Sequence, residues 1–191
     1  DEVFPFLTLI IATFNEELVI GQKLRNIAES DYPKDKMEVL IIDSASTDNT
    51  RIIVLDFIKN LNKNMNIRLL TQDERNGKVN ALNYALGFCK GDLVILSDAD
   101  VMLDNDGISK LVSNFNDESI GAVSGIEVIM NPQQSPVTRM EKSYRSFYNT
   151  LRLGESNLDS VMMCESELSA YRRDLISTIP EKSICDDMEL T

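Results

Sequence analysis

The chain has 191 residues, of which 43% are hydrophobic, and a formal net charge of −12 from 31 acidic and 19 basic residues. This length and apolar content are enough to bury the core of one domain. Such an acidic surface disfavours binding to nucleic acid, because neutralising phosphates requires clustered lysine and arginine. Histidine is absent, which excludes histidine-based mechanisms such as triads, imidazole general bases and histidine-ligated zinc.

The cysteines and the apolar runs indicate the cellular setting. Cys89, Cys164 and Cys185 lie far apart and form no CxxC pair, which is typical of reduced residues in a cytosolic compartment. No uninterrupted apolar run approaches the ~20 residues of a membrane span, and no signal peptide is visible. Because the chain stops at Thr191 in the middle of a pattern, we expect it to be a fragment of a longer protein.

Residues 1–115 alternate short apolar runs with segments of helical period. Runs rich in β-branched residues predict strands at 7–13, 38–43, 67–71 and 92–98. Apolar side chains at helical spacing predict helices at 19–28, 52–61, 79–89 and 108–115. Lys23 is the one polar interruption in the first of these helical stripes. The alternation predicts an α/β fold with a right-handed, mostly parallel sheet and ligands at the carboxyl ends of the strands.

The pattern changes after residue 120. Residues 121–130 predict one longer strand, and residues 137–153 predict a helix after chain breaks at Pro132 and Pro136. The remainder is weakly periodic and polar. We expect this second half to extend the same domain.

Polar side chains follow several of the predicted strands where each strand ends. Thr13 to Asn15 follow the first strand, Asp43 follows the second, and Asp98 and Asp100 follow the fourth. Two like charges about 6–7 Å apart at a strand end repel each other. A hard divalent cation, held by one or two carboxylates and by phosphate oxygens of a substrate, would remove that repulsion. The alternative for Asp98-Ala99-Asp100 is a solvated acidic turn.

The sequence also contains several longer blocks in a fixed order. They are LTLIIATFNEE (7–17), VLIIDSASTDNT (39–50), NGKVNALNYAL (76–86), GDLVILSDADVML (91–103), SAYRRDL (169–175) and DDMEL (186–190). In these blocks the chain resembles family 2 glycosyltransferases with the GT-A fold, and in particular the catalytic domain of membrane-associated, inverting polysaccharide and glycolipid glycosyltransferases. The resemblance implies one domain over 1–191, with a nucleotide-binding half (1–104) and an acceptor-side half (105–191) truncated at its C-terminus.

The resemblance also implies roles for individual residues. Those implied to contact the nucleotide-sugar donor are Thr13, Phe14, Asn15, Glu16, Asp43, Lys78 and Asp98. Asp43 would accept from a ring N–H of the base. Asp100 would ligate Mn²⁺ or Mg²⁺, and Asp98 would contact the ribose or the metal. Asp187, the second residue of the Asp-Asp pair, would be the general base.

Each of these positions also has a purely structural interpretation. Asn15 and Glu16 could cap the following helix, and Asp43 could form an Asx-turn. Lys78 could be an exposed lysine in the first turn of a helix. A positive charge is unusual there, however, which favours a phosphate or carboxylate partner. Asp187 could be an ordinary surface acid.

The implied activity is metal-dependent transfer of a sugar from a nucleotide-diphosphate sugar, with a UDP-sugar expected, to a hydroxyl of a glycan or lipid-linked acceptor. The implied setting is the cytoplasmic face of a membrane. Three features depart from the family pattern. Ser44 stands where many members carry a second aspartate, the glycine often found before the AYRR block is missing, and the Gln/Arg-x-x-Arg-Trp block of processive synthases is absent.

Other classes of protein fit the sequence less well. A response-regulator receiver would need its acidic pair after the first strand and would leave some 70 residues unexplained. A sugar-1-phosphate nucleotidylyltransferase would need a glycine-rich basic loop where the chain has ATFNEE. A nucleotide-sugar-binding domain without catalytic activity remains an alternative.

Overall fold

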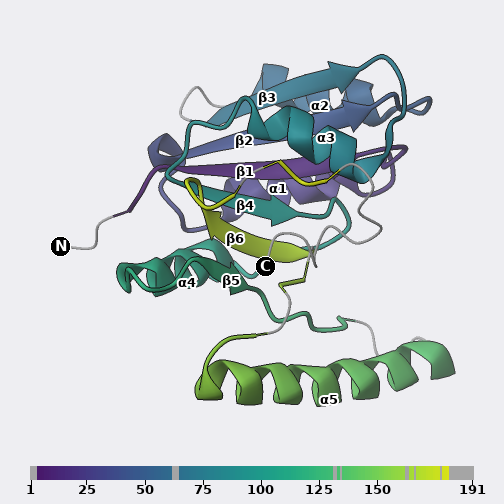
Figure 1. Ribbon diagram of the computed structural model, residues 1–191. Coiled ribbons are helices and arrows are strands. Elements are labelled where there is room, and N and C mark those ends of the chain that lie inside the picture. The colour runs from purple at the N-terminus through teal and green to yellow at the C-terminus, as the bar shows by residue number, and fades with distance from the viewer. Residues whose placement is uncertain are drawn as a thin grey trace.

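The computed structural model describes residues 4–61, 65–130, 133, 135–161, 164–165, 167–176 and 178–180. In this part of the chain a six-stranded sheet, of order β3-β2-β1-β4-β6-β5, carries helices on both faces (Figure 1). The strands are β1 (Leu7–Thr13), β2 (Met37–Ser44), β3 (Asn66–Gln72), β4 (Leu93–Ser97), β5 (Ala122–Ser124) and β6 (Leu168–Arg172). The α-helices are α1 (Ile20–Glu29), α2 (Thr50–Asn60), α3 (Gly77–Leu86), α4 (Gly107–Ser113) and α5 (Pro136–Leu158).

The parallel half of the sheet is covered on both sides, as the continuous apolar runs predict. Leu9 and Ile11 of β1 pack with α1, α2 and α4, whereas Ile10 between them packs with α3. This alternation follows from the two-residue period of a strand. Because β1, β2 and β4 have helices on both faces, almost every side chain in them is buried. In the edge strand β3 only Ile67 is buried.

The strand order places a crevice between β1 and β4. β1 pairs in parallel with β2 on one side and with β4 on the other, and β3 continues the sheet beyond β2. The chain therefore moves outward from β1 in one direction through β2 and β3, and then returns to β4 on the opposite side. In open α/β sheets such a switch point is where ligands bind, outside the carboxyl ends of the strands.

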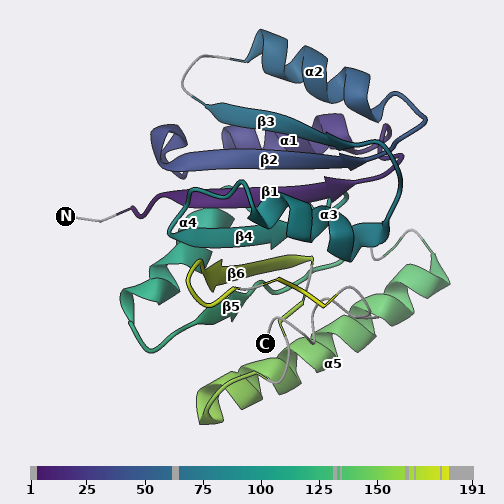
Figure 2. The ribbon, with the colours of Figure 1, turned by 45° about the horizontal axis from the view of Figure 1, so that its top comes forward.

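The second half adds an antiparallel edge. β6 pairs antiparallel with β4, and β5 with β6 (Figure 2). The single strand predicted over 121–130 is wrong beyond Ser124. β6 begins at Leu168, whose carbonyl accepts from the Gly125 N–H, so within the described residues the chain has no strand to pair with beyond Gly125 and leaves the sheet there.

Helix α5 is longer than predicted and lies apart from the sheet in both ribbon views (Figures 1 and 2). Pro136 starts the helix rather than only interrupting the chain, because Ser135 caps it in a capping box with Thr138. Arg145 and Arg152 attach α5 to the body through ion pairs, including one of 3.0 Å from Arg152 to Glu165. No helix in the described part of the chain combines the length and apolarity needed to cross a membrane.

Candidate active site

A pocket of about 320 Å³ opens at the carboxyl ends of the parallel strands, next to the switch point. Its lining comes from the ends of β1, β2 and β4 and from the start of α3. The lining residues are Ala12, Thr13, Phe14, Glu16, Ser44, Arg75, Gly77, Lys78, Ala81, Asp98, Ala99 and Asp100. The structure thus brings Thr13, Phe14, Glu16, Lys78, Asp98 and Asp100 together, as the sequence predicted, although they lie in three separate blocks.

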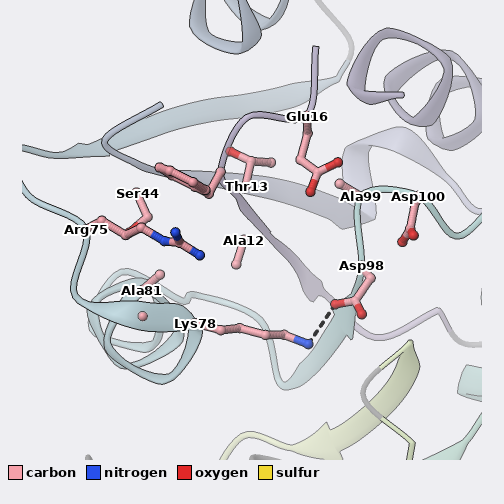
Figure 3. Close-up of a pocket in the computed structure, with 12 residues that line it drawn as sticks. Ala12, Thr13, Glu16, Ser44, Arg75, Lys78, Ala81, Asp98, Ala99 and Asp100 are labelled. Atoms are coloured by element: carbon pink, nitrogen blue, oxygen red, sulfur yellow. Dashed lines mark ion pairs between the residues drawn. The ribbon is translucent and has the colours of Figure 1, made fainter. Parts of the chain in front are cut away.

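The pocket holds charges of both signs (Figure 3). Arg75 lies on one side, while the carboxylates of Glu16, Asp98 and Asp100 lie on the other. Burial raises the pKa of Glu16, and the neighbouring charges of Asp100, Asp48 and Asp98 raise it further. This concentration of negative charge is therefore already costly in the protein alone, and a bound cation would relieve it.

Lys78 and Asp98 form an ion pair across the floor of the pocket. The Lys78 Nζ lies 2.8 Å from Asp98 Oδ1 (dashed in Figure 3). Burial raises the pKa of Asp98, and Asp100 adds to this increase, whereas Lys78 opposes it. Lys78 thus has a carboxylate partner, as expected for a lysine in the first turn of a helix. Gly77, which precedes it at φ 86°, allows the sharp entry into α3.

Asn15 does not line the pocket but joins the loops that follow β1 and β2. Its backbone is left-handed, at φ 57°. Its N–H donates to Ser46 Oγ (2.9 Å), and its Oδ1 accepts from the Thr47 N–H (2.8 Å). The neighbouring Glu16 N–H donates to Thr50 Oγ1 (2.8 Å). Neither side chain caps α1. The two loops therefore form one hydrogen-bonded rim above the pocket.

Asp43 is fully buried and does not line the pocket; the adjacent Ser44 does. The Asp43 carboxylate pairs with Arg51 and accepts from the Ser46 N–H at 3.1 Å. The Ser46 bond spans three residues rather than the two of the Asx-turn suggested by the sequence, although it also holds the loop after β2. Among the described residues its Oδ1 has no hydrogen-bond partner. Asp43 therefore stabilises the loop and still has an unused acceptor.

The sequence analysis assigned no site role to two polar residues of the lining, Arg75 and Ser44. The Arg75 guanidinium stacks over the Phe14 ring, 3.8 Å from its centroid. Ser44 donates to Gln72 Oε1 (3.0 Å), and Gln72 donates in turn to Asn80 Oδ1 (2.7 Å). Arg75 could have been noticed as a cation two residues before the Gly-Lys pair. The Ser44–Gln72–Asn80 chain has no signal in the sequence, because it depends on how β3 sits beside β2.

Two arginines of the AYRR block have structural partners. Arg172 donates to the backbone carbonyls of Ile120, Phe115 and Asp117, and Arg173 donates to that of Leu86. Asp187, the predicted base, lies outside the described residues.

The donor set fits a cation shared with a substrate rather than one held by protein alone. Among the described residues no group of three or more acidic or cysteine side chains could hold a metal ion. Asp98 and Asp100 offer two carboxylates in an open pocket. Mg²⁺ is commonly bound in this way, by one or two carboxylates with phosphate oxygens and water completing the shell.

Comparison with known proteins identifies the family. The model of Glycosyl transferase family 2 matches residues 8–179. The chain belongs to this family. Beta-monoglucosyldiacylglycerol synthase of Nostoc sp. is 29% identical over 190 residues, which are 98% of this chain and 40% of that protein. N-acetylglucosaminyltransferase of Rhizobium meliloti is 29% identical over 177 residues, which are 92% of this chain and 41% of that protein.

Solved structures confirm the predicted GT-A fold of this family 2 chain. Mannosyltransferase PcManGT from Pyrobaculum calidifontis, in complex with GDP-Man and Mn²⁺, is 34% identical and superimposes with a TM-score of 0.85 over 97% of this chain and 50% of that one. S. aureus TarS with UDP-GlcNAc is 20% identical at a TM-score of 0.66, covering 96% and 51%. The chain therefore spans two-fifths to about half the length of these relatives.

Proposed function

We propose that this chain is the donor-binding, catalytic part of an inverting, metal-dependent glycosyltransferase. It would move a sugar from a nucleotide-diphosphate sugar to a hydroxyl of a glycan or lipid-linked acceptor. The observation that carries the proposal is the gathering of Asp98, Asp100, Glu16 and Lys78 in one pocket at the switch point of the sheet. A pocket with both signs of charge suits a diphosphate and its counter-ion.

The nucleotide would enter with its base toward Arg75 and Phe14, away from the acidic side of the pocket. Thr13 and Ser44 line the pocket at the ends of β1 and β2. A contact from the unused Oδ1 of Asp43 to a ring N–H would require the base to reach past the pocket lining, because Asp43 is fully buried and does not line the pocket. Two nucleotide bases are candidates. The mannosyltransferase that is 34% identical was solved in complex with GDP-Man, whereas the sequence led us to expect a UDP-sugar.

The metal would be held by Asp100, with Asp98 as second ligand or as a contact to the ribose. When bound, Mn²⁺ or Mg²⁺ neutralises negative charge that develops on the diphosphate leaving group. Lys78 would share that task, because its ammonium reaches Asp98 and carries a positive charge to the same end of the pocket. Glu16 adds negative charge that favours a cation there.

Asp187 would accept the proton of the acceptor hydroxyl. A carboxylate on the sugar face opposite the leaving group gives inversion at the anomeric carbon. General-base assistance of this kind contributes about 10²–10⁴-fold in rate. The chain needs no histidine for any of these steps.

The test is turnover by the full-length protein. Purified protein is incubated with UDP-, GDP- or dTDP-sugars, with Mn²⁺ or with EDTA, and with glycan or diacylglycerol acceptors. Release of the nucleoside diphosphate and the anomeric configuration of the product are measured. We expect metal-dependent release with one nucleotide and an inverted product. Nucleotide binding without turnover under any of these conditions would favour the alternative of an inactive binding domain.

A further inference from the structure

Lys23 is a buried cation in the middle of an apolar helix face. It lies on α1 with Ile20, Leu24 and Ile27, which pack against the sheet, and its side chain has no exposed surface. Burying an ammonium group is unfavourable unless it is paired or hydrogen-bonded. A methionine would fill a similar volume without that cost. The charge of Lys23 therefore requires an explanation from its contacts.

The contacts of Lys23 are at the two ends of the turn that carries the two aspartates. Its Nζ donates to Ser97 Oγ (2.8 Å), at the last residue of β4, and to the backbone carbonyl of Val101, which follows Asp100. Ser97 Oγ donates onward to the Glu167 carbonyl at 3.1 Å, just before β6. The turn from Asp98 to Asp100 is thus held at both ends by Lys23 of α1, and at its first end also by the residue that precedes β6.

The same helix holds the following segment of chain. Asn26 of α1 donates from Nδ2 to the Leu103 carbonyl and accepts from the Leu103 N–H, both at 2.8 Å. Residues 97–103 are therefore attached to α1 at Ser97, Val101 and Leu103. Of these contacts, those of Lys23 are made to the two residues that flank the Asp98–Asp100 turn, Ser97 and Val101.

We propose that Lys23 is a positioning residue for the donor site. By tying Ser97 to Val101, its ammonium fixes the turn so that Asp98 and Asp100 present their carboxylates to one cation and one diphosphate. Lys23 itself touches neither ligand. This inference rests on the proposed function, since it assigns a role in binding the metal and the nucleotide.

Positioning and simple electrostatics predict opposite signs for the loss of Lys23. A positive charge close to Asp98 and Asp100 repels a metal cation, so its removal alone would tighten Mn²⁺ binding. If instead the hydrogen bonds of Lys23 to Ser97 and Val101 position the turn, the loss of Lys23 loosens the turn and weakens Mn²⁺ binding. Outer-shell partners of metal ligands change metal affinity or activity by about 10–100-fold when they are lost. The direction of the change therefore decides between the two explanations.

The experiment compares Lys23→Met with wild type in the full-length protein. Mn²⁺ affinity is measured by calorimetry in the presence of saturating UDP or GDP, whichever binds. We expect at least a tenfold weaker Mn²⁺ affinity, together with a lower kcat. Lys34→Met is the matched control. Lys34 donates to the Ser30 hydroxyl (2.8 Å) and the Tyr32 carbonyl (3.1 Å) beyond the end of α1, and burial lowers its pKa as well. We expect its Mn²⁺ affinity to match that of wild type.

Ser97→Ala keeps the test decisive if Lys23→Met fails to fold. It removes one end of the tie, and we expect a smaller loss of Mn²⁺ affinity in the same direction. In the double variant the effect of Lys23→Met should shrink, because residues in one network are not additive. Unchanged or tighter Mn²⁺ binding in Lys23→Met or in Ser97→Ala would overturn the inference. Absence of nucleotide binding in wild type would instead refute the proposed function.

Discussion

Lys23 also predicts how the stability of the protein depends on pH. Burial lowers the pKa of its ammonium to about 8, from an ordinary value of 10.5, although Asp98 and Asp100 partly oppose this decrease. Between these two pH values the unfolded chain binds a proton at Lys23 that the folded chain has released. The free energy of unfolding therefore gains a contribution as pH rises through this window, and loses it as pH falls through the folded pKa.

The size of this contribution follows from the pKa difference. Since one pKa unit corresponds to about 1.4 kcal/mol, the full difference corresponds to about 3 kcal/mol. Lys23→Met removes the titrating group, so the unfolding free energy of wild type minus that of the variant should rise by up to about 3 kcal/mol between pH 7 and pH 10.5. Other groups that titrate in this range, such as Cys89 and Lys34, are present in both proteins and cancel.

Urea unfolding followed by circular dichroism at pH 7, 8, 9 and 10 measures this difference directly. The assay compares wild type with Lys23→Met at each pH, with fitted slopes required to agree between the two proteins. A difference that stays constant across the series would mean that Lys23 titrates alike in the folded and unfolded chains, contrary to the prediction. A falling difference would give the wrong sign and would refute it as well.

Further predictions concern Gly91, Lys78 and Asp187. A β-carbon on Gly91 would lie 2.4 Å from the Thr8 backbone nitrogen, so Gly91→Ala should lower the unfolding free energy by about 1–3 kcal/mol in urea melts. By contrast, Gly154 lies on α5 with open space around it, and Gly154→Ala should raise the unfolding free energy by up to about 1 kcal/mol. Lys78→Met should weaken nucleotide binding about tenfold in calorimetry. It should change the free energy of unfolding by less than about 1 kcal/mol, because the Lys78–Asp98 ion pair is one-third exposed. Equal losses of binding free energy and unfolding free energy would contradict a binding role. Asp187→Asn in the full-length protein should lower kcat by about 10²–10⁴-fold with unchanged donor affinity, and unchanged turnover would remove its assignment as the base.

The sequence predicted the parallel half of the fold well because the signals there are local. Continuous apolar runs such as residues 38–43 reflect burial on both faces, and the stripe around Leu24 reflects one helix face. Because ligand sites lie at the carboxyl ends of parallel strands, the sequence also predicted that Asp98 and Asp100 lie near Thr13, and all three line the pocket. Pairing partners are not local, however. The strand expected over 121–130 has an apolar pattern to its end, but in the part of the chain that the structure describes it pairs with β6 only as far as Ser124.

The orientation of individual side chains in the site could not be predicted, because it depends on contacts between residues far apart in the sequence. Asp43 ends a buried strand like Asp98 does, yet it turns to Arg51 and Ser46, eight and three residues later, rather than into the pocket. Lys23 was visible only as an interruption in a stripe. Its partners lie more than 70 residues away, at Ser97 and Val101. Such assignments require the packing of α1 on β4.

The central claim is that Asp100 and its neighbours bind a nucleotide diphosphate through a divalent cation. The most direct measurement is the thermal stability of the protein with UDP, GDP or dTDP, each with and without Mn²⁺, in wild type and Asp100→Asn. Ligand at about 100 times its dissociation constant adds about 2.7 kcal/mol to the stability of the form that binds it. We expect each binding nucleotide to raise the melting temperature, and Mn²⁺ to enlarge that increase in wild type but not in Asp100→Asn. No shift with any nucleotide, or an equal effect of Mn²⁺ in both proteins, would contradict it.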